Sequence, residues 1–237
     1  MALQKSHIQN RLLRYLEAED FEAISGYLEP VRLIHKQDIL AAGEDADFCY
    51  FPDTGIGSLM AVSTEGNRVE VGLIGRDGVL PVAPVLGVRR SSTKIIMQVP
   101  GQGHRIPVHT MMMMLDERAG LRKAFLNFAH TLWLQTAHTA QSNAIHKVTE
   151  RLARWILMCH DRVDDGDIEL THEFIALMLA VRRPSVTESL HILEGAHMIR
   201  SRRGVITVLD REALELFAQD AYGTPEREYQ ELLGPLR

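Results

Sequence analysis

Residues 121–165 contain neither glycine nor proline, and such a stretch predicts continuous or nearly continuous helix. Its first part carries apolar side chains at alternating spacings of four and three residues: Leu121, Phe125, Phe128 and Leu132. This stripe is typical of a helix that pairs with a second helix, although a helix packed on a β-domain has a similar pattern. The stripe continues as the polar residues Gln135, Thr139 and Ser142. A polar continuation indicates either a device for partner specificity or the lining of a ligand site.

A second apolar stripe follows in the same stretch. It consists of Val148, Leu152, Trp155, Ile156 and Cys159. The change of stripe predicts that the first helix ends and a separate domain begins near residue 145.

The chain before this stretch has the pattern of a β-domain. Between residues 30 and 108, clusters of glycine, proline or aspartate recur, among them residues 52–55, 75–78 and 100–103. The runs between the clusters are short and strand-like: residues 31–35, 49–51, 58–62, 69–74 and 94–99. Short strands separated by turn signals predict a compact antiparallel sandwich or barrel.

After residue 166 the pattern shortens to two brief helices and a hairpin. Thr171, followed by the acidic Glu173, predicts the start of the first helix. Pro184 fits the first turn of the second helix, where its missing N–H has no helical partner to lose. The second helix carries Val186, Leu190 and Leu193 on one side and ends at Gly195. Residues 198–200 and 205–208 then form the two strands of a hairpin with arginines at its tip.

Helix, turn, helix and hairpin in this order predict a winged helix-turn-helix between about residues 170 and 210, which places its second helix in the major groove of DNA. The chain has a formal net charge of −5, so contact with DNA requires a local basic patch. That patch consists of Arg182, Arg183, Arg200, Arg202 and Arg203, opposed by Glu188 and Glu194.

The side chains in this segment suit two kinds of DNA contact. An arginine can bond two acceptors of guanine, and a carboxylate can accept from the cytosine amino group. Hydroxyl groups and the hairpin arginines suit phosphate oxygens. The expected DNA-binding residues are Thr171, Arg182, Arg183, Ser185, Thr187, Glu188, His191, Arg202 and Arg203.

Several short motifs recur along the chain in a recognisable order. In the C-terminal half they are residues 148–153, 170–176 and 183–193, with Met198 and Ile199. In the N-terminal half they are residues 43–44, 50–52, 57–58, 69–72 and 74–78. Through these motifs, residues 10 to 215 resemble the Crp/Fnr superfamily of bacterial transcription regulators.

The resemblance implies an α+β fold with four parts. These are an N-terminal antiparallel β-roll like that of cyclic-nucleotide-binding domains (1–117), a long dimerisation helix (118–145), a C-terminal winged helix-turn-helix (146–215) and a C-terminal extension (216–237). It also implies a cytoplasmic homodimer that binds a palindromic site in double-stranded DNA and contacts RNA polymerase.

The resemblance assigns roles in DNA reading position by position. Arg183 matches the family's guanine-reading arginine, and Ser185 matches a hydroxyl that binds phosphate. Pro184 stands where members like the cAMP receptor protein carry a base-reading glutamate, and Glu188 stands where they carry a second arginine. These departures imply a half-site different from that of the cAMP receptor protein.

The effector site departs further from the family's pattern. In cyclic-nucleotide binders a Gly-Glu pair holds the ribose and an Arg-Ser pair holds the cyclic phosphate. Here no glutamate follows Gly78, and a Ser-Ser pair stands in place of Arg-Ser. The effector-site candidates are Arg89, Arg90, Ser91, Ser92 and Thr136, the last near a position where the family contacts the base. These departures predict an effector other than cAMP, or none, while a cyclic-nucleotide sensor that acts through protein contacts remains the alternative.

The sequence does not indicate an enzyme. It has no H-x-x-x-H pair beside a glutamate, no G-x-S-x-G elbow and no complete dinucleotide-binding glycine loop. We therefore expect no catalytic residue, metal or cofactor, and we expect His104 and His109 at the surface or at strand ends. Cys49 and Cys159 are too few for a four-cysteine iron–sulfur cluster and are expected as buried free thiols. No apolar run is long enough to span a membrane, and no secretion signal is recognisable.

Overall fold

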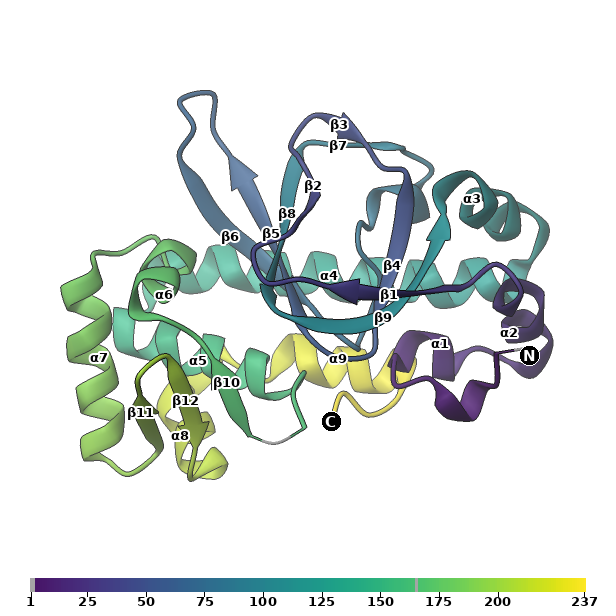
Figure 1. Ribbon diagram of the computed structural model, residues 1–237. Coiled ribbons are helices and arrows are strands. Elements are labelled where there is room, and N and C mark those ends of the chain that lie inside the picture. The colour runs from purple at the N-terminus through teal and green to yellow at the C-terminus, as the bar shows by residue number, and fades with distance from the viewer. Residues whose placement is uncertain (1–2, 165) are drawn as a thin grey trace.

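Two sets of strands and one long helix organise the computed structural model, which describes residues 3–164 and 166–237 (Figure 1). The helical elements of the N-terminal half are η1 (Lys5–His7), α1 (Arg11–Tyr15), α2 (Ala18–Ser25), η2 (Ala83–Leu86) and α3 (Val108–Glu117). Its strands are β1 (Glu29–Leu33), β2 (Asp38–Leu40), β3 (Glu44–Asp45), β4 (Phe48–Pro52), β5 (Ile56–Val62), β6 (Arg68–Ile74), β7 (Arg90–Ser91), β8 (Thr93–Val99) and β9 (Gly101–Pro107).

The strands of the N-terminal half pair in an antiparallel manner throughout. One sheet has the order β1-β9-β4 and the other has the order β2-β8-β5-β6, while β3 and β7 form a short separate pair. The mixture of these strands with C-terminal helices confirms the α+β fold that the sequence predicts.

The cluster at residues 100–103, which reads as a turn in the sequence, is instead mostly strand. Gly101 and Gly103 belong to β9, which pairs with both β1 and β4. A Cβ atom on Gly103 would lie 2.1 Å from the carbonyl oxygen of Phe51. These glycines are therefore required by close approach between backbones rather than by a reversal of the chain.

The long helix α4 spans Ala119–Ile145, and α5 follows at Val148–His160 after two extended residues. The backbone N–H of Lys147 donates to the Glu150 carboxylate at 2.9 Å, which caps the start of α5. The stripe formed by Leu121, Phe125, Phe128 and Leu132 is buried within the chain, in one core with the β-roll. Of the two readings that this stripe allows, packing onto the β-domain is the one observed.

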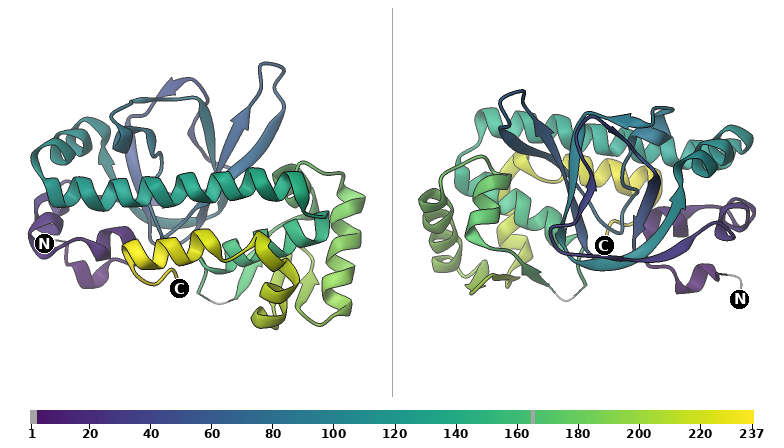
Figure 2. Two further views of the ribbon diagram at one scale, coloured as in Figure 1. Left: turned by 180° about the vertical axis from the view of Figure 1, so that it is seen from behind. Right: turned by 45° about the horizontal axis from the view of Figure 1, so that its top comes forward.

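The C-terminal half adds a small sheet and further helices. Its elements are β10 (Asp167–Glu169), α6 (His172–Met178), α7 (Arg183–Gly195), β11 (Ile199–Arg202), β12 (Val205–Val208), α8 (Arg211–Ala218), η3 (Gln219–Ala221) and α9 (Thr224–Leu233). The sheet order is β10-β12-β11. Seen from behind, α9 lies alongside α4 and covers part of the same face of the molecule (Figure 2).

Apolar and polar contacts join the two halves. Ile56, Met60 and Leu73 of the β-roll belong to the same buried cluster as the side chains of the winged helix. The indole N–H of Trp155 on α5 donates to the Glu70 carboxylate of β6 at 2.6 Å, and both side chains are buried. The winged helix therefore packs directly on the β-roll.

None of the helices in the described ranges has both the length and the apolar character needed to cross a membrane.

Candidate nucleic-acid interface

Local signals set the ends of the two helices of the helix-turn-helix. Thr171 is the N-cap of α6, and its hydroxyl accepts a hydrogen bond from the backbone N–H of Phe174 at 3.2 Å. Pro184 lies in the first turn of α7. Ala180, in the turn between the helices, has a φ of 51°. Residues other than glycine rarely adopt this left-handed conformation. These local signals set where each helix of the motif begins.

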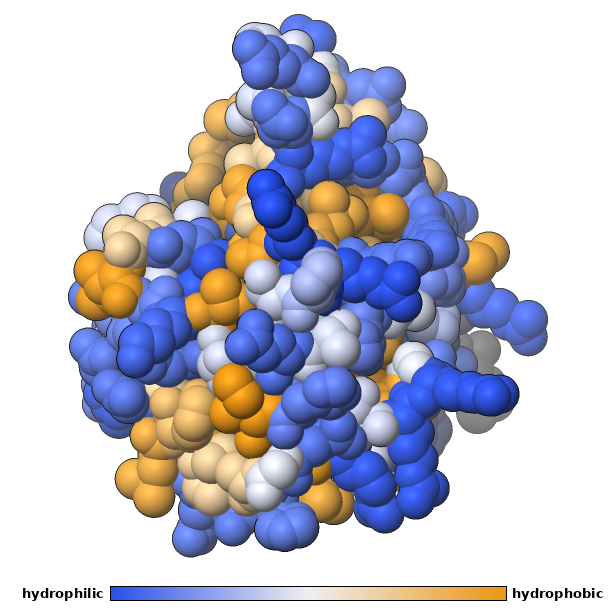
Figure 3. Space-filling view, turned by 90° about the vertical axis from the view of Figure 1, so that its left-hand side faces the viewer, coloured by the Kyte–Doolittle hydropathy of each residue, from blue (hydrophilic) through white to orange (hydrophobic). Residues whose placement is uncertain are grey.

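One side of α7 is buried and the other is open. Val186, Ser189, Leu190 and Leu193 are buried, and the hydroxyl of Ser189 meets that of Thr149 on α5 at 3.0 Å. The open side forms a shallow hollow of about 700 Å³ lined by Arg183, Pro184, Thr187, Glu188, His191 and Ile192. Figure 3 looks onto this end of the molecule, where hydrophilic side chains predominate with apolar ones between them.

The charged groups on the open side are only weakly engaged. The Nη1 atom of Arg183 lies 3.7 Å from Oε1 of Glu173, and both side chains are mostly exposed, so the pair contributes little stability. The hydroxyl of Thr187 lies 3.1 Å from Nδ1 of His172. The Arg183 guanidinium is therefore free to exchange its neighbour for a ligand at small cost.

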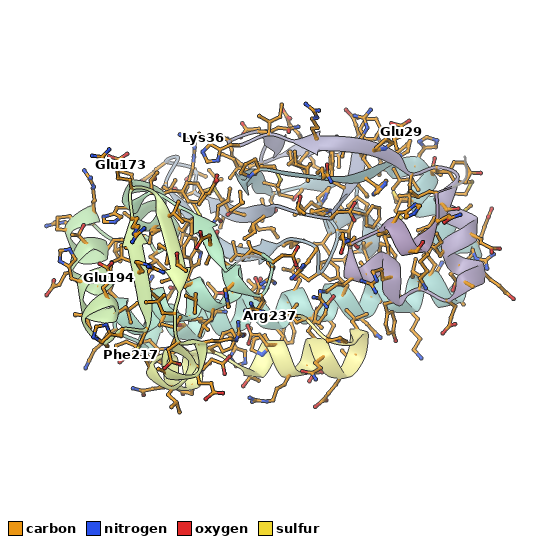
Figure 4. The ribbon with its side chains drawn as sticks, turned by 60° about the horizontal axis from the view of Figure 1, so that its bottom comes forward. Glu29, Lys36, Glu173, Glu194, Phe217 and Arg237 are labelled. Atoms are coloured by element: carbon orange, nitrogen blue, oxygen red, sulfur yellow. The ribbon has the colours of Figure 1, made fainter. Side chains whose placement is uncertain are left out.

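The wing carries the second group of basic residues. Arg202 pairs with Val205 across the hairpin, and Gly204 at the tip has a φ of 77°, which a glycine adopts without strain. Arg202 and Arg203 are exposed there. The Glu194 carboxylate accepts a hydrogen bond from the backbone N–H of Ser201 at 2.6 Å and so lies against the wing strands (Figure 4).

The structure brings together most, but not all, of the residues that the sequence singles out. Arg183, Thr187, Glu188 and His191 line one hollow, while Arg182 is the exposed N-cap of α7 and Ser185 is half-buried. The exposed Ile192 shares the hollow but is absent from the predicted set. It lies one turn after Glu188, so helical spacing alone could have placed it on this face.

The effector-site candidates are spread over two places. The guanidinium Nε of Arg90, in β7, donates to the carbonyl of Gly43, and the Ser91 hydroxyl lies 2.8 Å from that of Thr93. Arg89 and Ser92 are exposed. Thr136 lies on α4 and donates to the carbonyl of Leu132 at 3.0 Å. Within the part of the chain that the structure describes, no hydrogen bond joins Thr136 to residues 89–92.

Two expectations about histidine and cysteine can be compared with the fold. His104 is not at the surface: it lies in β9, is 9% exposed and has Nδ1 3.2 Å from Oδ2 of Asp53. The sequence predicted His104 at the surface or at a strand end, whereas it lies within β9; His109 is exposed on α3. Cys49 and Cys159 are both buried free thiols, as predicted, and burial raises the pKa of Cys49 to about 12. Among the described side chains, no group of three or more His, Cys, Asp or Glu is placed to hold a metal ion.

Comparison with known proteins agrees with this geometry. Residues 150–217 match the model of the Crp-like helix-turn-helix domain. The global nitrogen regulator of Synechococcus elongatus is 28% identical over 185 residues, which cover 74% of this chain and 83% of that protein. The corresponding regulator of Synechocystis is 26% identical over the same length.

Solved structures share the fold. FixK2 from Bradyrhizobium japonicum superposes with a TM-score of 0.68 at 13% identity, covering 80% of this chain and 96% of that one. A transcriptional regulator of the CRP/FNR family from Thermus thermophilus has a TM-score of 0.62 at 22% identity, covering 81% and 98%. Residues 150–217 therefore form a Crp-like helix-turn-helix domain, and the chain as a whole has the fold of Crp/Fnr regulators and is similar in sequence to the global nitrogen regulators.

Proposed function

We propose that the protein is a cytoplasmic homodimer that reads a palindromic DNA site, with α7 of each protomer in the major groove. The observation that carries the proposal is the open side of α7, where Arg183, Thr187, Glu188 and His191 line one hollow. A guanidinium, a hydroxyl, a carboxylate and an imidazole on one helix face offer the donors and acceptors that base edges require. Two such helices would meet half-sites about one helical turn, roughly 34 Å, apart.

Each DNA-binding residue receives a role within this proposal. Arg183 and Glu188 contact base edges, with Thr187 and His191 beside them on the same face. Four exposed or half-buried side chains around the helix contact phosphates: Thr171, Arg182, Ser185 and, from the wing, Arg202. Arg203 joins Arg202 at the wing tip. Phosphate contacts set the affinity, and the base contacts set the sequence.

The outward side of α4 is the proposed dimer seam. Leu126 and Trp133 lie seven residues apart on this helix and are 44% and 63% exposed. Ala137 and Ala140 continue the same side and are exposed too. Exposed apolar side chains gathered on one helix face mark a protein–protein contact. The proposed dimer seam therefore lies on the exposed side of α4, away from the buried stripe that begins at Leu121.

The β-roll is proposed to respond to something other than cAMP. Arg90 and Ser91 lie in β7, which pairs with β3, and Nε of Arg90 and the Ser91 hydroxyl are already engaged in the contacts described above. Calorimetry with cAMP and cGMP tests this directly, because micromolar or tighter binding would favour a cyclic-nucleotide sensor. The same proposal divides the chain into its parts near residues 117, 145 and 215. It also includes a contact with RNA polymerase.

Selection of bound duplexes from a random pool tests the function as a whole. We expect enriched sequences to be palindromes with half-sites about one turn apart. Arg14→Ala serves as the matched control for substitutions in α7, because Arg14 is exposed on α1, far from the winged helix. Failure to enrich any sequence, with or without added effectors, would contradict the proposal.

A further inference from the structure

The C-terminal segment of the chain returns from the winged helix to the β-roll. After α8 and η3, α9 packs along α4 and reaches α1 (Figures 1 and 2). The family resemblance ends near residue 215, so it assigns no role to this helix.

One end of the segment is anchored in the N-terminal core. Tyr229 and Leu233 are each 4% exposed and belong to the same buried cluster as Phe125 and Phe128. The Tyr229 hydroxyl donates to the backbone carbonyl of Asp77 at 2.7 Å. These contacts are made with the β-roll and the long helix rather than with the winged helix.

The other end is anchored in the winged-helix half. The Tyr222 hydroxyl, just before α9, donates to Oδ2 of Asp161 at 2.8 Å, at the end of α5. Arg211 of α8 donates to Oδ1 of the same carboxylate at 2.8 Å. In addition, Nε2 of His146, in the link between α4 and α5, lies 2.9 Å from Oδ1 of Asp220 in η3.

Asp77 of the β-roll is where the two attachments meet. Its carboxylate accepts from Nε and Nη2 of Arg162, just after α5, at 2.9 and 2.6 Å. Both side chains of this ion pair are almost fully buried, so removal of either partner would be strongly unfavourable. The backbone carbonyl of Asp77 accepts the bond from Tyr229. A single residue thus holds the end of α5 and the middle of α9.

The consequence concerns the freedom of the DNA-binding half. His146 and Lys147 are extended residues between α4 and α5, so the orientation of the winged helix depends on its direct contacts with the β-roll and on the contacts that α9 adds to them. We propose that α9 is a strap that fixes the winged helix on the β-roll and thereby sets the half-site spacing that the dimer accepts. The spacing part rests on the proposed function, since it takes a DNA-binding dimer as given.

The first test needs no DNA and uses the full-length chain. Leu233→Ala removes apolar contact at the anchor, and Tyr229→Phe removes only the hydroxyl that meets Asp77. Arg227→Ala is the matched control, because Arg227 is exposed on the same helix and bonds only Thr224 among the described residues. We expect amide hydrogen exchange at residues 146–150 to rise in Leu233→Ala, to rise less in Tyr229→Phe and to stay unchanged in the control.

The second test measures binding to palindromes of different spacing. The selected palindrome is compared with versions whose half-sites are one or two base pairs closer or farther apart. For Leu233→Ala we expect the preference for the best spacing to fall about fivefold or more, at the lower end of usual coupling between sites. Affinity for a single isolated half-site should stay unchanged, because α7 itself is not altered.

The two tests separate the strap from the proposed function. Unchanged exchange at residues 146–150 in Leu233→Ala would overturn the strap whatever the DNA result. Raised exchange with an unchanged spacing preference would overturn its role in spacing. If exchange rises but the wild-type chain binds no palindrome, the proposed function fails and the mechanical role of α9 stands.

Discussion

Replacing Glu70 by glutamine tests how the β-roll and the winged helix are held together. Glu70 lies on β6, is 5% exposed and accepts the indole N–H of Trp155 at 2.6 Å, while its Oε2 has no hydrogen-bond partner among the described residues. Burial raises the pKa of Glu70 to about 7, although Ser58, Trp155 and the guanidinium groups of Arg154 and Arg162 act in the opposite direction. The carboxyl therefore titrates near neutral pH.

The sign of the effect follows from proton binding. Between its ordinary pKa of 4.5 and its folded value of about 7, Glu70 is protonated in the folded protein and ionised in the unfolded chain. The free energy of unfolding therefore falls as the pH rises through this range, and it stays lowered above it. Each pKa unit corresponds to about 1.4 kcal/mol, so the full loss is about 3 kcal/mol. Glutamine is neutral at every pH and does not suffer this loss.

The assay is denaturant unfolding of both proteins over a series of pH values. Relative to wild type, Glu70→Gln should become about 3 kcal/mol more stable between pH 4.5 and pH 8. His160, whose pKa burial lowers to about 4, adds stability as the pH rises and so opposes Glu70 in both proteins. Subtracting one curve from the other removes that contribution, and Glu65→Gln, at an exposed carboxylate in the β5–β6 hairpin, is the matched control. A flat difference curve for Glu70→Gln would refute the reasoning.

Four other substitutions test the interface and the core. Arg183→Ala should lose about 1–3 kcal/mol at one base pair of the half-site, and equal weakening on all operator variants would contradict base reading. Arg202→Ala should weaken binding to every sequence alike and make the salt dependence shallower by about one unit of slope. Trp133→Glu should shift the proposed dimer toward a folded monomer in sedimentation, since this side chain is 63% exposed in the single chain. Gly78→Ala places a Cβ atom 2.0 Å from the ring of Phe128 and should lower the free energy of unfolding by about 1–3 kcal/mol, whereas an unchanged denaturation midpoint would show that the ring moves aside freely.

The helix-turn-helix is the part of the fold that the sequence predicts best, because its signals are local. Thr171 caps α6 and Pro184 lies in the first turn of α7, where their chemistry puts them. The exposed side of α7 follows from helical periodicity once Val186 and Leu190 are known to be buried. Spacing within a dozen residues is enough for all of these predictions.

Features that depend on distant parts of the chain were harder to predict. Gly101 and Gly103 look like turn residues, but they lie in a strand, where the backbones of Thr54 and Phe51 approach them closely. The burial of His104 depends on Asp53, which is far away in the sequence. Pro225 lies in the first turn of α9, a helix whose position depends on the contact of Tyr229 with the distant Asp77. In each of these cases a residue far away in the sequence determines the structure, and local sequence preferences do not indicate which residue that is.

The long helix shows why an apolar stripe predicts burial but not the burying surface. On α4, Phe125 and Phe128 are buried by the chain's own β-roll and α9, while Leu126 and Trp133 form an exposed side. Both sides repeat at helical spacing, so periodicity alone cannot tell which one meets a second protomer. The main core is complete within one chain, which means that a folded monomer should exist when the seam is disrupted. A Trp133→Glu protein that unfolds rather than dissociates would show that the outward side also supports the fold of the single chain.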